Sequence, residues 1–246
     1  MGKNKLVKFA EMEHFRNVFQ PTWQELHSRG FPLKGDWGGS FFGNSNSLVV
    51  EMGCGKGEYS VTLAEKFPGL NFIGIDIKGA RMYTGAKYAL EKGLGNVAFV
   101  RTKIENSGYL FGPGEVEAIW LTFPDPQMKN CRKRLTSTGF LNLYASFLKP
   151  GGMIHLKTDS AFLYNYTVAL ARLNRLTIVR QTGDLYASGI ADEILSIRTF
   201  YEKQWVERGI PVKYLSFRMN PDTDLQEPEE EFEKDTYRSF GRSARN

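Results

Sequence analysis

The alternation of apolar runs with helical segments is the feature that most constrains how this chain can fold. Apolar runs of strand length occupy seven places, at residues 47–52, 71–77, 96–101, 117–123, 153–158, 176–181 and 212–219. Most are separated by segments in which Leu, Ala, Tyr and Phe recur at helical spacing, at 58–67, 79–93, 138–148, 161–173 and 200–209. Such an alternation is typical of βαβ units, whose parallel strands are covered by helices on both faces. We therefore predict an α/β fold with a doubly wound, mostly parallel, seven-stranded sheet.

The composition changes towards both ends of the chain and divides it into three parts. Residues 1–42 are expected to form an N-terminal arm with short helices, residues 43–220 the main domain, and residues 221–246 an acidic, flexible tail. The whole chain carries a net charge of +5, but residues 222–246 hold eight acidic and four basic side chains, so residues 1–221 carry +9. A body this basic favours a polyanionic partner such as a nucleic acid, with a solvated basic surface as the alternative.

Several classes of protein are disfavoured by the same composition. No apolar run is long enough to span a bilayer, and the first residues lack the apolar core of a secretory signal, so we expect a cytoplasmic protein. The two cysteines, Cys54 and Cys131, form no CxxC pair and the three histidines are scattered, so we expect free thiols and no metal. The sequence is compatible with a monomer or a homodimer.

A glycine-rich turn between a strand and a helix, "VVEMGCGKGEYS", predicts a nucleotide-like ligand site. Gly53 and Gly55 allow tight turning, and Asp76 ends the next strand at the interval expected for a ribose-binding acid. The spacing is GxGxG, not the GxGxxG of dinucleotide binders, and Glu51 before the loop would repel a pyrophosphate. The same carboxylate would attract the sulfonium and ammonium groups of S-adenosylmethionine, which we expect as the cofactor. A structural glycine turn and a nicotinamide oxidoreductase are the alternatives.

The stretch "LTFPDPQMKNCRKRL", residues 121–135, places an acid between two prolines at the end of a core strand. In a doubly wound sheet the ligand crevice lies at the carboxyl ends of the strands. Four acids would converge there: Glu51, Asp76, Asp125 and Asp159. The two prolines restrict the backbone and would hold the Asp125 carboxylate in place, although a rigid turn without a chemical role is the alternative.

Four cations follow this acid, namely Lys129, Arg132, Lys133 and Arg134. As a group beside the crevice they favour contacts with RNA phosphates, whereas each one alone fits a solvated basic loop equally well. Phe123 or Tyr201 would stack on exposed bases.

Five motifs in this order resemble those of the bacterial tRNA (guanine-N7)-methyltransferases: "VEMGCGKGEYS", "GIDIKGAR", "FPDPQMKNCRKRL", "HLKTD" and "IRTFYEKQWVERGIPV". The resemblance covers roughly residues 47–219. It implies a class I, Rossmann-like methyltransferase fold. It also implies transfer of a methyl group from S-adenosylmethionine to N7 of a guanosine in the variable loop of tRNA.

The resemblance further implies roles for single residues. Glu51 and Asp76 match positions that bind the cofactor, and Asp125 matches an acid held to be catalytic and close to it. Positions that contact the substrate are matched by Lys129, Asp159 and the run from Thr199 to Glu202. Two departures concern Gln127, where the family usually has Trp, and Lys103, where it usually has Asp or Asn. The adenine contact therefore falls to Lys103 or to Glu105.

Some of these residues also have a purely structural explanation. Thr199 and Glu202 fit a capping box at the start of the last helix, and Asp159 fits an N-cap. Guanine N7 has a free lone pair and loses no proton on alkylation, so Asp125 would orient the guanine and offset its developing charge. Another S-adenosylmethionine-dependent RNA methyltransferase and a non-catalytic tRNA-binding protein are the remaining alternatives.

Overall fold

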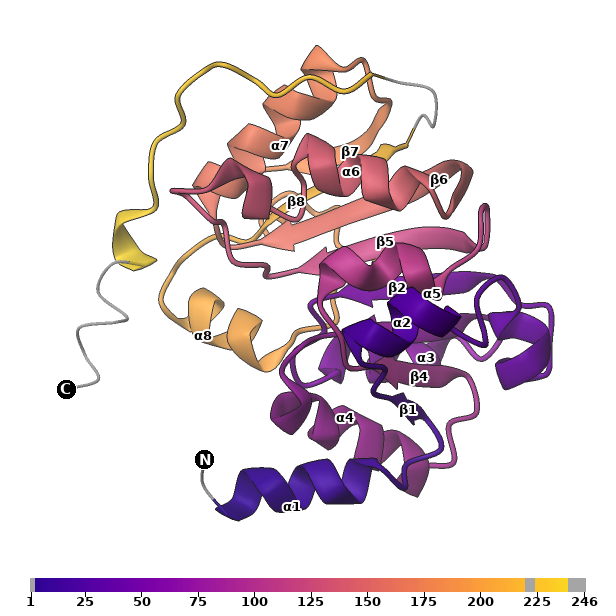
Figure 1. The fold of residues 1–246 in the computed structure, drawn as a ribbon. Helices are drawn as coiled ribbons and strands as arrows, with labels where there is room; N and C mark the ends of the chain where they lie inside the picture. Colours follow the sequence, from indigo (N-terminus) through magenta and orange to yellow (C-terminus); the bar gives the residue numbers. More distant parts are fainter. Residues whose placement is uncertain (1–2, 220–223, 239–246) are drawn as a thin grey trace.

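The computed structural model of the protein describes residues 3–219 and 224–238. One sheet has the strand order β1-β4-β3-β2-β5-β6-β8-β7 (Figure 1). β8 is antiparallel to both of its neighbours, and the other pairings are parallel. The strands are β1 (Val18–Phe19), β2 (Leu48–Met52), β3 (Asn71–Ile75), β4 (Val97–Val100), β5 (Val116–Thr122), β6 (Leu148–Thr158), β7 (Ile178–Thr182) and β8 (Lys213–Arg218).

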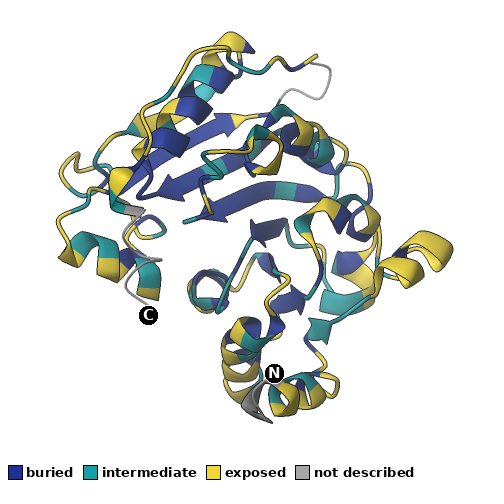
Figure 2. Cartoon of the chain, turned by 60° about the vertical axis from the view of Figure 1, so that its left-hand side comes forward, coloured by how far each residue is buried: buried dark blue, intermediate teal, exposed yellow. Residues whose placement is uncertain are grey.

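Helices cover both faces of the sheet, which explains why its central strands are buried along their whole length (Figure 2). Apolar side chains of α3 and α4 pack on one face, and those of α2, α5, α6 and α7 on the other. The α-helices are α1 (Lys3–Met12), α2 (Trp23–Arg29), α3 (Glu58–Lys66), α4 (Gly79–Glu91), α5 (Ser107–Leu110), α6 (Thr138–Ala145), α7 (Ala161–Leu173) and α8 (Phe200–Glu207). Shorter helical turns are η1 (Trp37–Phe42), η2 (Ile104–Asn106), η3 (Cys131–Lys133) and η4 (Thr236–Arg238).

The predicted doubly wound, mostly parallel fold is confirmed, but within residues 3–219 and 224–238 the sheet has eight strands rather than the predicted seven. The additional strand is β1, in which Val18 pairs with Phe99 and Phe19 with Val100. A strand of two residues is too short to show an alternating pattern, so no local signal predicted it. Its pairing joins the N-terminal arm to the edge of the sheet.

The acidic C-terminal segment is packed where the structure describes it. Within residues 224–238, Leu225 is buried, and the Phe232 ring lies 6.2 Å from the Phe162 ring and 5.8 Å from the Tyr166 ring of α7. Apolar side chains interspersed among the acids thus pack against α7 within residues 224–238, and the flexibility of the tail stays a prediction. Residues 220–223 and 239–246 of this expected tail lie outside the described part. The division into arm, domain and tail remains a prediction.

No helix in the described ranges is long and apolar enough to cross a membrane.

Candidate active site

A cavity of about 420 Å³ lies at the carboxyl ends of β2, β3 and β5, beneath the start of α8. This is the edge at which a doubly wound sheet binds its ligands. Six of the residues predicted to form the site line it: Glu51, Gly53, Gly55, Asp76, Asp125 and Thr199. The structure thus brings together the glycine loop, three acids from the ends of three strands and the cap of α8.

The glycine loop is shaped by backbone conformation and by Asp76. Gly53, Gly55 and Gly57 all have positive φ, at 82°, 55° and 74°, a region in which a side chain is strained. The Gly55 amide donates to Asp76 Oδ2 at 2.9 Å, and the Lys78 amide donates to Asp76 Oδ1 at 2.7 Å. Asp76 therefore fixes the loop as well as facing the cavity, and each of its oxygens keeps a lone pair for a further donor.

Glu51 is buried at the floor of the cavity with 4% of its surface exposed. Its Oε2 accepts hydrogen bonds from the Ser60 amide at 3.1 Å and the Ser60 hydroxyl at 2.5 Å, and its Oε1 accepts one from the Thr122 hydroxyl. Burial nevertheless raises the pKa of Glu51 to about 7, because these hydrogen bonds only partly offset the lost hydration and Asp76 adds repulsion. A cation in the cavity would favour the charged form and reverse this shift.

The Pro-Asp-Pro turn is flanked by two non-glycine residues with positive φ. Phe123 and Gln127 have φ of 50° and 47°, which non-glycine residues adopt only where the surrounding structure holds them. Asp125 lies exposed between them, and its Oδ1 accepts from the Gln127 amide at 3.0 Å. Strain of this kind clusters at functional sites. The prolines predicted a rigid turn, whereas the two positive φ angles became visible only in the structure.

The start of α8 forms the wall opposite the glycine loop. Thr199, Tyr201 and Trp205 line the cavity from this helix. Two contacts tie the wall to the loop: the Phe200 amide donates to Glu58 Oε2 at 2.9 Å, and Lys56 Nζ lies 3.8 Å from the centre of the Phe200 ring. The site is therefore closed by a segment far away in sequence.

Three cations that sequence reasoning missed also line the cavity, namely Lys56, Lys78 and Arg81. The Arg81 guanidinium lies 5.7 Å from the Tyr201 ring centre and so faces the wall formed by α8. The available signal was their position, because Lys56 lies within the predicted glycine-rich turn, and Lys78 and Arg81 follow Asp76 by two and five residues.

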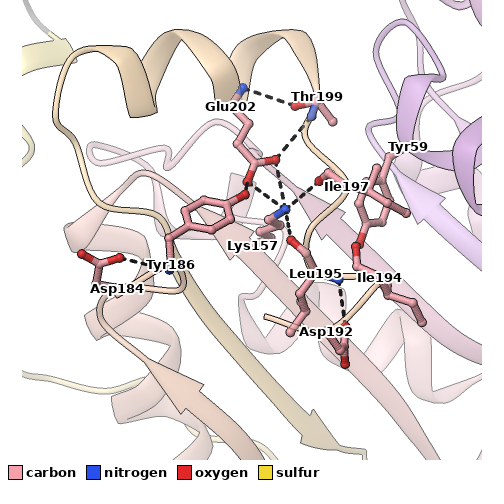
Figure 3. Close-up of polar contacts among 10 residues, drawn as sticks. All are labelled: Tyr59, Lys157, Asp184, Tyr186, Asp192, Ile194, Leu195, Ile197, Thr199 and Glu202. Atoms are coloured by element: carbon pink, nitrogen blue, oxygen red, sulfur yellow. Dashed lines mark hydrogen bonds and ion pairs between the residues drawn. The ribbon is translucent and has the colours of Figure 1, made fainter. Parts of the chain in front are cut away.

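Glu202 and Lys157 form a buried ion pair behind this wall (Figure 3). Lys157 Nζ lies 2.8 Å from Glu202 Oε1, and both side chains are fully buried. The same ammonium donates to the carbonyls of Leu195 at 2.7 Å and Ile197 at 2.8 Å, while the Tyr186 hydroxyl donates to Glu202. The pair fastens α8 to the end of β6, and the two carbonyl bonds fasten the segment before α8 there as well. Burial lowers the pKa of Lys157, although Glu202 opposes that shift.

Thr199 and Glu202 also form the capping box that the sequence offered as their structural alternative. The Thr199 hydroxyl accepts from the Glu202 amide at 3.3 Å, and Glu202 Oε2 accepts from the Thr199 amide at 3.3 Å. Thr199 remains at the cavity, whereas Glu202 is enclosed. A direct substrate contact is therefore open to Thr199 but not to Glu202 in this conformation.

The other predicted substrate residues divide by exposure. Lys129, Arg132 and Lys133 are exposed on the loop that follows Asp125. Arg134 is buried, with its guanidinium 4.8 Å from the Phe162 ring centre and 4.4 Å from that of Tyr166. Asp159 is also buried and accepts from the Tyr237 hydroxyl at 2.9 Å. The alternative role of Asp159 as N-cap of α7 was wrong, because the N-cap is Ser160, whose hydroxyl accepts from the Leu163 amide at 2.9 Å.

The two residues considered for the adenine contact lie outside the main cavity. Lys103 lines an adjoining hollow of about 320 Å³ together with Ile77, which directly follows Asp76. Glu105 is exposed on η2 and does not line either space. The hollow therefore begins at Ile77, next to Asp76, the acid expected to hold the ribose. Its lining favours Lys103 over Glu105 for the adenine contact.

Comparison with known proteins assigns the family. Residues 45–215 match a family model described as "Putative methyltransferase". The tRNA (guanine-N(7)-)-methyltransferase of Bacteroides thetaiotaomicron is 52% identical over 100% of this chain and 98% of its own length. That of Porphyromonas gingivalis is 55% identical over 96% of this chain and 98% of its own length. This chain belongs to the tRNA (guanine-N7)-methyltransferase family. The resemblance inferred from the five motifs is thereby confirmed.

Solved structures support the fold of this tRNA (guanine-N7)-methyltransferase family member. The 16S rRNA methyltransferase KamB superimposes with a TM-score of 0.56 at 14% identity, over 74% of this chain and 91% of KamB. A structure described as an antibiotic related methyltransferase gives 0.53 at 19% identity, over 72% of this chain and 89% of its own. At such identities the likeness concerns the Rossmann-like sheet and not the substrate.

Proposed function

We infer that this chain transfers a methyl group from S-adenosylmethionine to N7 of a guanosine in tRNA. Relatives that are 50–55% identical over nearly the whole chain carry the name of that activity. Within the structure, the observation that carries the inference is the convergence of Glu51, Asp76 and Asp125 on one cavity. Three acids from three strands suit a positively charged donor and a base that becomes positively charged.

The donor set of the cavity fits S-adenosylmethionine. Glu51 lines the cavity, and its ionised carboxylate would repel a phosphate and attract a cation, so Glu51 would hold the ammonium end. Asp76 would accept hydrogen bonds from the ribose hydroxyls, and Gly53 and Gly55 let the backbone approach the ligand closely. Lys103 would contact the adenine from the adjoining hollow. When bound, S-adenosylmethionine supplies an electrophilic methyl group on a sulfonium centre.

Asp125 is the proposed catalytic residue, and its task is orientation and charge stabilisation. Guanine N7 has a free lone pair, so no strong base has to remove a proton. One Asp125 oxygen is engaged by the Gln127 amide, and the other has no hydrogen-bond partner among the described residues. That oxygen is available to a guanine N–H group, and the carboxylate charge would offset the charge that develops on the ring.

The substrate side of the cavity suits a nucleic acid. Lys129, Arg132 and Lys133 would neutralise backbone phosphates beside Asp125. Tyr201 and Trp205 line the wall and would stack against a base that leaves its helix. We place the reaction in the cytoplasm, because tRNA is its substrate.

One incubation distinguishes the candidate functions: the protein, radiolabelled S-adenosylmethionine and unmodified tRNA, followed by nucleoside analysis. We expect the label in 7-methylguanosine. Label in another nucleoside would indicate a different RNA methyltransferase, and tRNA binding without label would indicate a non-catalytic binder. Tighter binding of a dinucleotide than of S-adenosylhomocysteine would favour an oxidoreductase instead.

A further inference from the structure

Residues 224–238, which we call the C-terminal strap, connect the far side of the sheet with the substrate side of the cavity. In Figure 1 this segment passes over α7 and descends to η4 near α8. It is anchored near its start, where the Asn174 side chain accepts from the Gln226 amide at 2.7 Å and donates to the Gln226 carbonyl at 2.8 Å. Two of its acids then reach the first turns of two different helices.

Glu227 joins the basic loop to α6 and α7. Its Oε1 accepts from the Thr138 amide at 2.9 Å and from the Thr138 hydroxyl at 2.8 Å. Its Oε2 accepts from the Tyr166 hydroxyl at 2.6 Å and from the Cys131 thiol at 3.1 Å. Ser137, the N-cap of α6, makes no side-chain capping bond, so Glu227 supplies the missing acceptor from outside the helix.

Asp235 performs the equivalent task at α7. It is buried, and it accepts from the Phe162 amide at 3.2 Å and from the Ser160 hydroxyl. Two residues later, the Tyr237 hydroxyl donates to the Asp159 carbonyl at 3.0 Å, and the Tyr237 ring lies 5.5 Å from that of Trp205. The strap therefore touches the two helices that begin after β5 and β6 and also the helix that closes the cavity.

The Glu227 contacts hold the loop that carries the exposed cations. Residues 127–134 begin at the strained turn that holds Asp125 and end at Arg134, whose guanidinium stacks on α7 and donates to the Gln127 carbonyl at 3.4 Å. Cys131 lies in the middle and is bound to Glu227. Lys129, Arg132 and Lys133 project between these anchors. Their spacing in the folded protein therefore depends on the strap.

We propose that Glu227 is a positioning residue for tRNA: the strap uses it to hold residues 127–134 so that their exposed cations meet the backbone phosphates. This rests on the proposed function of the cavity. The strap is acidic, and by charge alone the removal of an acid next to a basic loop would strengthen tRNA binding. Positioning has the opposite consequence, so the two effects are distinguished by their sign.

The test compares Glu227→Ala with Glu229→Ala in the full chain. Glu229 is exposed on the same strap, and its replacement changes the net charge equally. We expect Glu227→Ala to raise KM and Kd for unmodified tRNA by about tenfold, since hydrogen bonds to a charged group are lost. We expect it to leave the Kd for S-adenosylhomocysteine within about twofold, because none of the hydrogen-bond partners of Glu227 lines the cavity. Its log Kd should also depend less steeply on log salt concentration, since fewer phosphates are neutralised. Glu229→Ala should bind tRNA as well as the wild type or slightly better.

Two results would overturn the proposal: unchanged or tighter tRNA binding in Glu227→Ala, or an equal loss in both variants. Should Glu227→Ala lose S-adenosylhomocysteine binding and hence its fold, Tyr166→Phe removes one Glu227 bond and should give a smaller loss of tRNA affinity in the same direction. Binding that stays at the wild-type value in that variant would then reject the role. The nucleoside analysis of the wild-type protein tests the proposed function separately. If it finds no 7-methylguanosine, the difference in tRNA affinity between the wild type and Glu227→Ala can still be measured.

Discussion

The cofactor side of the cavity is built from neighbouring parts of the sequence, whereas the substrate side is assembled from segments far apart. Glu51 binds Ser60 nine residues away, and Asp76 binds the Gly55 amide across 21 residues. On the substrate side, Lys157 binds Glu202 across 45 residues and Glu227 binds Thr138 across 89. Apart from the hydrogen bond of Thr122 to Glu51, which spans 71 residues, the first side follows from one βαβ unit, while the second depends on polar contacts between distant elements. Substitutions on the two sides should therefore have different consequences.

The largest effect should come from breaking the buried pair behind α8. Lys157→Met leaves the Glu202 carboxylate buried without its ammonium, so we expect a loss of about 3–5 kcal/mol in the free energy of unfolding. Lys149→Met is the control, because the Lys149–Glu117 pair has a similar separation, 2.7 Å against 2.8 Å, but lies at the surface with both side chains more than 40% exposed. It should cost less than about 1 kcal/mol. Equal losses in urea unfolding would show that burial of the pair is unimportant.

Asp125→Ala should have the next largest effect, and this effect should be on the reaction alone. We expect kcat to fall by at least about a hundredfold, because the group that orients and stabilises the transition state is removed. Calorimetry should give a Kd for S-adenosylhomocysteine within a few-fold of the wild-type value. Asp125→Asn, which keeps the shape but not the charge, separates orientation from charge stabilisation. An Asp125→Ala enzyme that retains its activity would refute the role.

Glu51→Gln should weaken the cofactor side without unfolding it. The amide can keep hydrogen bonds to Ser60 and Thr122 but cannot attract an ammonium, so we expect S-adenosylhomocysteine to bind about tenfold more weakly. The melting temperature of the ligand-free variant should not fall at pH 8, because the wild-type protein buries a charge there that the variant lacks. Unchanged S-adenosylhomocysteine affinity would show that Glu51 does not contact the cationic end.

The smallest expected effect is a pH dependence of cofactor affinity. The pKa of Glu51 is raised from its ordinary 4.5 to about 7, so ligand-free Glu51 is largely protonated at pH 6, and binding of a cation must release that proton. From pH 8 to pH 6 the Kd for S-adenosylhomocysteine should rise by up to about tenfold, and Glu51→Gln should flatten this change.

The raised pKa of Glu51 also affects stability, because the folded ligand-free protein binds the proton more tightly than the unfolded chain does. The contribution of Glu51 to stability is therefore full below pH 4.5 and lost as the pH rises through about 7.

The sequence predicted the sheet and the cofactor side because their signals are local. Apolar runs separated by helical periodicity imply parallel strands, and Glu51, the glycines and Asp76 lie within one βαβ unit. Gly57 requires glycine for two reasons. Its φ is positive, and a Cβ at this position would lie 2.6 Å from the Phe99 ring. The positive φ belongs to the turn itself and could be predicted locally, whereas the contact with Phe99 depends on β4.

The substrate side was predicted less completely because its residues acquire their roles only through tertiary contacts. Arg134 is identical in chemistry to Arg132, yet one stacks on α7 while the other is exposed. The sequence pattern around Glu202 fitted both a helix cap and a substrate contact. Only the structure shows that Glu202 is buried in an ion pair with Lys157. The short strand β1 and the packing of Leu225 and Phe232 also left no periodic signal in the chain.

The sequence by itself determined the fold class, the position of the glycine loop and the acids that end β2, β3 and β5, since strand periodicity and turn chemistry act over a few residues. Tertiary structure alone decided which cations are free, which acids are enclosed and how the C-terminal strap meets the basic loop. The physical reason is desolvation. Whether a charged side chain faces water or a buried partner depends on elements that are 45 to 89 residues away, and no local pattern encodes that distance.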